Sequence, residues 1–102
     1  MSRQDEIFEA SQYLGLSAGH FAAWGAKWHE TGHYGDRFQD KLADMSLNLT
    51  ERTTLRDTAI KRAATYLAKS AREGKIEAAE LPKRLEIAKE EVDRRIAELA
   101  ER

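Results

Sequence analysis

The stretch TERTTLRDTAIKRAATYLAKSARE, Thr50 to Glu73, contains no proline or glycine and repeats its apolar residues every three or four positions. On a helix this spacing gathers one apolar face, made of Leu55, Ala59, Ala63, Tyr66 and Leu67. Gly74 follows directly and can take the left-handed conformation that ends many helices. The pattern therefore predicts a long amphipathic helix from about Thr50 to Glu73.

A second long helix is predicted from about Glu77 to Ala100. Its near-heptad seam consists of Leu81, Leu85, Ala88, Val92, Ile96 and Leu99. Pro82 is compatible with this helix only in or near its first turn. Residues 50–102 are thus expected to form an antiparallel hairpin. Because two helices cannot bury both sides of their seam, the hairpin must pack on the N-terminal half or on another subunit, and we expect a homo-oligomer.

Residues 1–49 predict three shorter helices. The first runs from about Asp5 to Leu14 and ends at Gly15, and the second follows the N-cap Ser17 and ends at Gly32 and Gly35. The third spans about Asp36 to Leu47. Apolar residues expected to face the core are Phe21, Trp24 and Trp28 on the second helix and Phe38, Leu42, Met45 and Leu49 on or after the third. The predicted fold class is all-α, with five helices in one compact domain.

The composition excludes several classes of protein. The 102 residues include no cysteine, so disulfides and cysteine-ligated zinc or iron–sulfur sites are excluded. No apolar run approaches the roughly 18 residues that span a bilayer, and the N-terminus MSRQDEIFEA is polar and acidic rather than a signal peptide. We expect a cytoplasmic protein that does not contact membranes.

Positive charge is concentrated in the third quarter of the chain. Residues 50–75 carry seven basic side chains against three acidic ones, although the net charge of the whole chain is −1. Five of these cations are predicted on the side of the helix opposite its apolar face: Lys61, Arg62, Lys69, Arg72 and Lys75. Thr54, Thr58 and Thr65 are predicted on the same side. Such a stripe either contacts the phosphates of duplex DNA or is an ordinary solvated helix face.

The segment EASQYLGLSAGHFAAW, residues 9–24, resembles the helix-turn-helix of the MerR and excisionase-type DNA-binding families. Ser11 stands where those families place a small residue at the helix crossing, and Gly15 stands at their turn glycine. Their apolar positions are matched by Leu14, Leu16, Phe21 and Trp24. The resemblance implies binding of double-stranded DNA, with a second helix lying in the major groove.

The helix that this resemblance assigns to base recognition has few side chains that can hydrogen-bond to bases. Its candidate DNA contacts are Ser17, His20 and, late in the helix, Lys27. No Arg, Lys, Asn or Gln, the residues that bind bases in a bidentate manner, occurs between Ser17 and Lys27. An alternative is that the small residues Ala18, Gly19, Ala22 and Ala23 let a partner protein approach closely.

The sequence His29-Glu-Thr-Gly-His33 matches the zinc-protease pattern in which two histidines one helical turn apart share a metal. The extended pattern H-x-x-G-x-x-H fails, because Asp36 stands where it needs glycine and Gln39 stands where it needs the third histidine. We therefore expect no enzymatic activity and no cofactor. A structural metal site formed by His29, His33 and Asp36 is a minor alternative, which requires the helix to continue through Gly35.

Two hypotheses of function remain open. The first is a small helical DNA-binding protein, a regulatory or packaging accessory factor of a phage or mobile element. Phage small terminase subunits resemble this layout, with an N-terminal helix-turn-helix followed by a helical hairpin. The second is a non-enzymatic adaptor or inhibitor that binds another protein and uses the helix-turn-helix only as a packing scaffold.

Overall fold

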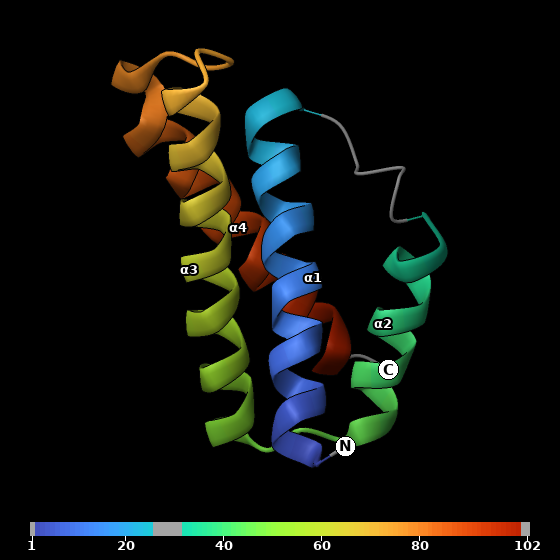
Figure 1. Ribbon diagram of the computed structural model, residues 1–102. Helices are drawn as coiled ribbons and strands as arrows, with labels where there is room; N and C mark the ends of the chain where they lie inside the picture. Colours follow the sequence, from blue (N-terminus) through green and yellow to red (C-terminus); the bar gives the residue numbers. More distant parts are fainter. Residues whose placement is uncertain (1, 26–31, 101–102) are drawn as a thin grey trace.

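The computed structural model describes residues 2–25 and 32–100 (Figure 1). These residues form four α-helices and one 3-10 turn: α1 (Arg3–Trp24), α2 (Gly32–Met45), α3 (Leu49–Arg72), η2 (Ala78–Glu80) and α4 (Leu81–Ala100). Helices α1 and α3 run in one direction, and α2 and α4 run in the other (Figure 1). The chain is thus an up-down-up-down helical bundle. The all-α class is confirmed, whereas the prediction of five helices is wrong.

The helix count differs because α1 is continuous where the sequence predicted a turn. Gly15 lies inside α1, and positive φ angles among the described glycines occur at Gly25 and Gly74. Gly25 takes the left-handed conformation at φ 67° and donates its N–H to the Phe21 carbonyl, so the helix ends there. Residues 9–24 therefore do not adopt the two-helix geometry of a helix-turn-helix in this structure.

Gly15 serves close helix packing instead of a turn. A Cβ atom placed at Gly15 would lie 2.5 Å from Cβ of Arg62 and closer still to the Ala59 carbonyl oxygen. At Gly19, one turn further, an added Cβ would lie 3.0 Å from the ring of Tyr66. The absence of side chains at these two positions allows α3 to lie directly against the backbone of α1.

The small residues of α1 are buried within the chain itself. Ala18, Gly19, Ala22 and Ala23 all belong to the buried face of α1. That face is wider than a single stripe because α1 packs against α2, α3 and α4. Gly19 lies against the side chain of Tyr66 of α3. Because the chain's own helices bury all four residues, they do not form the exposed surface that the sequence argument for a partner protein required.

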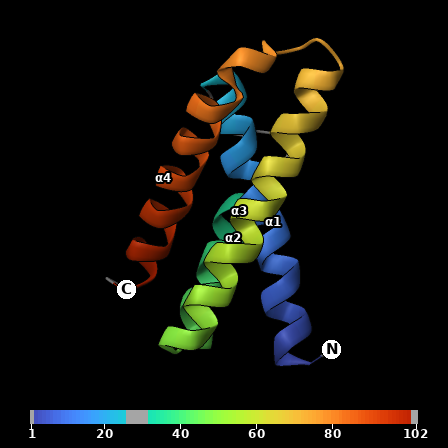
Figure 2. The same cartoon turned by 90° about the vertical axis from the view of Figure 1, so that its left-hand side faces the viewer.

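The core lies between the four helices, whose arrangement two views show (Figures 1 and 2). Its largest fully buried aliphatic side chains are Leu14, Leu42, Leu55, Leu67 and Val92. Helices α3 and α4 run antiparallel, and both pack on α1. The hairpin thus buries its seam on the N-terminal half of the same chain, which removes the structural need for a second subunit.

Local signals explain where the remaining helices begin and end. Asn48 is the N-cap of α3, and its side chain accepts a hydrogen bond from the backbone N–H of Glu51. Gly74, at φ 73°, follows α3 as predicted. Pro82 is the second residue of α4, in the first turn where proline is tolerated.

Two predictions for the middle of the chain require correction. Helix α2 begins at Gly32 rather than about Asp36, so Gly35 lies inside a helix and does not end one. Leu49, predicted to face the core, is the first residue of α3 and is 78% exposed. Leu47, two residues earlier, is buried in its place.

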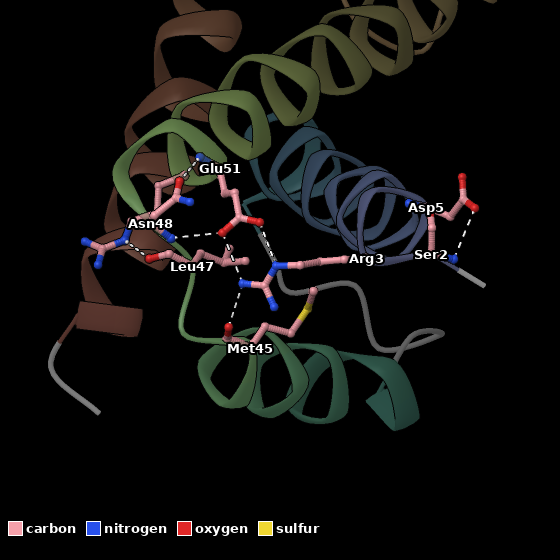
Figure 3. Close-up of polar contacts among 8 residues, drawn as sticks. Ser2, Arg3, Asp5, Met45, Leu47, Asn48 and Glu51 are labelled. Atoms are coloured by element: carbon pink, nitrogen blue, oxygen red, sulfur yellow. Dashed lines mark hydrogen bonds and ion pairs between the residues drawn. The ribbon is translucent and has the colours of Figure 1, made fainter.

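A polar cluster connects the start of α1 to the start of α3 (Figure 3). Arg3 donates to both carboxylate oxygens of Glu51, at 2.6 and 3.0 Å, and to the Met45 carbonyl oxygen at 2.7 Å. Glu51 also accepts a hydrogen bond from the backbone N–H of Asn48. The guanidinium of Arg3 and the N–H of Asn48 lower the pKa of Glu51 from 4.5 to about 2.

We predict that Gly15→Ala destabilises the protein although alanine is the better helix former. Alanine should gain about 1 kcal/mol in helix propensity, but overpacking typically costs about 1–3 kcal/mol, and here a backbone carbonyl must move. Urea denaturation should show a net loss in the free energy of unfolding. Gly19→Ala should lose less, because its added Cβ meets only side-chain atoms of Tyr66, at 3.0 Å or more, and no backbone atom. A more stable Gly15→Ala variant would contradict the close packing of α1 on α3.

We predict that Glu51→Gln lowers stability at neutral pH. Because the pKa of Glu51 is depressed in the folded protein, its contribution is complete above the unfolded value of 4.5 and is lost as the pH falls towards about 2. The difference in unfolding free energy between the wild type and the variant should therefore shrink over this range. Glu9→Gln, on the exposed surface of α1, should leave the unfolding free energy unchanged; equal effects of both variants would contradict the role of Glu51.

Candidate nucleic-acid interface

Four cations form what we call the α3 basic edge, defined as Lys61, Arg62, Lys69 and Arg72. At 100° per residue they lie within one sector of α3. Lys61, Lys69 and Arg72 are exposed, whereas Arg62 is half-buried. The sequence placed Arg62 opposite the apolar face, but in the structure its aliphatic stem lies beside Gly15 of α1. The edge therefore runs along the side of α3 that adjoins α1.

The cations of the α3 basic edge and the nearby Lys75 differ in whether they form salt bridges. Lys69 Nζ lies 3.8 Å from Glu73 Oε1, and Lys75 Nζ lies 3.0 Å from Glu73 Oε2. These two cations and, to a smaller extent, Arg72 lower the pKa of Glu73, with the hydrogen bond from Lys75 as the largest cause. Within the described part of the chain, Lys61, Arg62 and Arg72 form no salt bridge. Three of the four edge cations therefore have no salt-bridge partner among the described residues and can donate hydrogen bonds to a ligand.

Part of this charge has a structural explanation. Lys69 and Arg72 stand in the last turn of α3, where cations interact favourably with the negative end of the helix dipole. The hydroxyl of Thr65 donates to the Lys61 carbonyl oxygen at 3.0 Å, so its proton is already used. Thr54 and Thr58 line a separate cavity nearer the start of α3.

Helix α1 adds little charge to the α3 basic edge. The stretch from Gln4 to Trp24 contains no lysine or arginine, and its first turn is acidic, with Asp5 and Glu6. Ser17 lies two residues after Gly15, about 200° around the helix, and so faces away from α3. His20 does approach α3, where its ring lies 6.4 Å from that of Tyr66. Lys27 lies outside the described residues.

Trp24 was predicted to be a core residue, but 43% of its surface is exposed. Its indole Nε1–H donates to the Tyr66 hydroxyl at 3.1 Å, which connects the end of α1 to α3. Phe21 is half-buried, and Trp28 lies outside the described residues. The periodicity placed these aromatic residues on one helix face but could not indicate that the bundle leaves Trp24 uncovered.

Next to Trp24 lies an open cavity of about 250 Å³. Residues from three segments line it: Ala23, Trp24, Gly74, Lys75, Ile76, Glu77, Glu80 and Arg84. The guanidinium of Arg84 is held on both sides, since it donates to Glu80 at 2.7 Å and to the Ala22 carbonyl oxygen at 3.1 Å. No signal in the sequence brings Trp24 and Arg84 together, because this contact depends on how α4 packs against the end of α1.

The buried ionisable groups of the described residues serve structure. Glu91 of α4 is 7% exposed and accepts hydrogen bonds from Arg94 and Arg95, at 2.6 and 3.0 Å. Burial would raise the pKa of this carboxyl, but the two arginines outweigh it and the pKa is lowered. Glu91 is therefore a paired carboxylate and lacks the raised pKa of a general acid.

The described residues contain no group of three or more His, Cys, Asp or Glu side chains placed to hold a metal ion. His29, one of the three metal ligands proposed from the sequence, lies outside the described residues. His33 and Asp36 fall within α2, but their side chains lie outside the described part. Helix α2 does continue through Gly35, which was the condition for the last two residues to share a helix face.

A second surface feature lies at the opposite end of α1. Phe8 and Leu49 are 60% and 78% exposed, respectively. Phe8 lines a cavity of about 370 Å³ between α1 and α3, with Ile7, Thr54 and Thr58 among the other lining residues. The sequence did not predict the exposure of Leu49, since its spacing from Leu42 and Met45 placed it on an apolar helix face.

Among the described residues, no helix combines the length and the apolar character needed to cross a membrane. A comparison of this chain with protein-family models, with curated proteins and with solved structures finds no match.

Proposed function

We propose that this protein acts by binding rather than by catalysis, and that its ligand is DNA, contacted at its phosphates by the α3 basic edge. The observation that carries this proposal is that Lys61, Arg62 and Arg72 lie along one side of a single helix and form no salt bridge with any described residue. Phosphate contacts of this kind supply most of the affinity of proteins that bind DNA without sequence preference.

The dimensions of the α3 basic edge support a backbone contact. Lys61 and Arg72 are eleven positions apart, which corresponds to roughly 17 Å at 1.5 Å per residue. A DNA strand rises roughly 3.4 Å per phosphate along the duplex axis, so an edge of this length can span about five phosphates. Four cations over this distance are enough for weak binding that depends strongly on salt.

Base-specific recognition is not part of the proposal. Ser17 faces away from α3, and His20 lies near the C-terminal end of a continuous helix. A helix-turn-helix instead presents the N-terminal residues of a separate helix to the major groove. The resemblance of residues 9–24 to the MerR and excisionase-type families, like that of the layout to phage small terminase subunits, thus supports DNA as a ligand class only by analogy.

Neutralising the α3 basic edge should abolish this binding. In the test variant, Lys61, Lys69 and Arg72 become glutamine, and Arg62 becomes methionine so that its stem still packs beside Gly15. Fluorescence anisotropy with a labelled mixed-sequence duplex should give a slope of log K against log salt of about −3 to −4 for the wild type. The variant should show no measurable binding at low salt.

A control variant with Lys41, Lys83 and Lys89 changed to glutamine removes charge from α2 and α4 instead. It should keep the salt slope of the wild type, and circular dichroism should show that both variants remain helical. Equal losses in the two variants would mean that overall charge, and not the α3 basic edge, governs binding. Unchanged binding in the test variant would overturn the proposal.

The second candidate is a protein-binding adaptor, which the exposure of Phe8 and Leu49 favours. Large apolar side chains this exposed beside a cavity are common at protein interfaces. The simplest partner is a second copy of the chain, in line with the homo-oligomer expected from the sequence. Sedimentation velocity should then show an oligomer that Phe8→Gln combined with Leu49→Gln converts to a monomer. A wild-type monomer across the accessible concentrations would exclude this form of the adaptor.

A further inference from the structure

We infer that the cavity beside Trp24 accepts an unpaired nucleobase, so that the preferred ligand of the protein is single-stranded DNA. This inference rests on the proposed function, because the α3 basic edge must supply the phosphate contacts. It adds a ligand class and a stacking site that the duplex model lacks. Proteins that bind single strands combine a positively charged track with aromatic side chains on which the bases stack.

Trp24 has the properties of a stacking side chain. Its indole is 43% exposed, and the hydrogen bond from Nε1 to the Tyr66 hydroxyl, at 3.1 Å, fixes the ring from one edge. Tyr66 is itself positioned by its packing against Gly19. A ring that is held in place while it remains exposed loses little conformational freedom when a base stacks on it.

The volume of the cavity limits the size of the ligand that it can hold. Its volume of about 250 Å³ is below the roughly 300–1,000 Å³ of sites for drug-sized ligands, which favours a single ring system. Most of the cavity lining is polar, and Ala23, Trp24 and Ile76 contribute the smaller, apolar part. The guanidinium of Arg84, fixed by Glu80 and the Ala22 carbonyl, adds a planar cation that can interact with an aromatic ring.

The charges around the cavity determine how a strand would lie. Glu77 and Glu80 line the cavity and repel phosphate, while Arg84 compensates Glu80. Lys75, the other cation of the lining, pairs with Glu73. Lys69 stands three residues beyond Tyr66 and Arg72 six residues beyond it, near the same end of α3. This arrangement favours a base in the cavity and its phosphates over Lys69 and Arg72. A duplex keeps its bases stacked inside and cannot make the same contact without unpairing.

The test compares three ligands of matched charge by fluorescence anisotropy on the full-length chain: an oligothymidine of about 12 nucleotides, an abasic oligomer with the same number of phosphates, and a duplex with the same total phosphate number. Oligothymidine should bind about tenfold more tightly than the abasic oligomer, because stacking contributes substantially per base. Trp24→Leu should remove this preference, whereas Trp24→Phe, which keeps an aromatic ring, should retain most of it.

The possible outcomes separate the two proposals. Equal, salt-dependent binding of oligothymidine and the abasic oligomer would overturn the stacking site and leave the proposed function intact. A preference for oligothymidine that survives in Trp24→Leu would place the stacking elsewhere and also overturn the inference. No binding of any ligand at low salt would overturn both. The comparison on the wild type does not depend on whether Trp24→Leu folds.

Discussion

The backbone of α1 lies against the Ala59 carbonyl of α3 at Gly15, a separation that a residue with a side chain would not allow without a shift. This contact sets the distance between the two helices that run in the same direction. Glycine within a helix costs about 1 kcal/mol relative to alanine, and the packing of α3 along the bare backbone offsets that cost. The other elements of the bundle are arranged around this pair.

The close packing of α1 against α3 also determines which side chains are exposed on the surface. Because α1 buries its small residues against its neighbours, the side chains it leaves exposed include few cations and many neutral or acidic groups. The α3 basic edge lies along the side of α3 that adjoins α1, whereas Arg56 of α3 pairs with Asp93 of α4. At one end of the α1–α3 pair, Trp24 remains uncovered next to Arg84, and at the other end Phe8 and Leu49 are exposed.

The sequence signals were most reliable for the second half of the chain. Leu55, Ala59, Ala63 and Leu67 recur at helical spacing and are buried, and Gly74 follows the helix as its position indicates. In the first half, Gly15 misled the prediction, because a glycine can either end a helix or let another helix approach, and both uses are compatible with the same neighbours in sequence. Only the presence of α3 against Gly15 distinguishes them.

In the candidate site, too, some features could be predicted from the sequence and others could not. The sequence identified the α3 cations, since charge can be counted along a helix, but it could not show that Lys69 and Lys75 pair with Glu73 while Lys61, Arg62 and Arg72 form no such pair in the described residues. It also predicted that Trp24 lies in the core, because its spacing places it on the apolar face of its helix. Periodicity does not show how far the neighbouring helices extend over that face.

The sequence by itself therefore determined that this chain is helical, where its last two helices lie and which of them carries the positive charge. These properties depend on local spacing, capping residues and composition. The tertiary structure alone decided that α1 is one helix, that its small residues face α3, and that Trp24 lies exposed beside a cavity shared with α4. The physical reason is that these features depend on contacts between residues far apart in the chain, which local periodicity does not record.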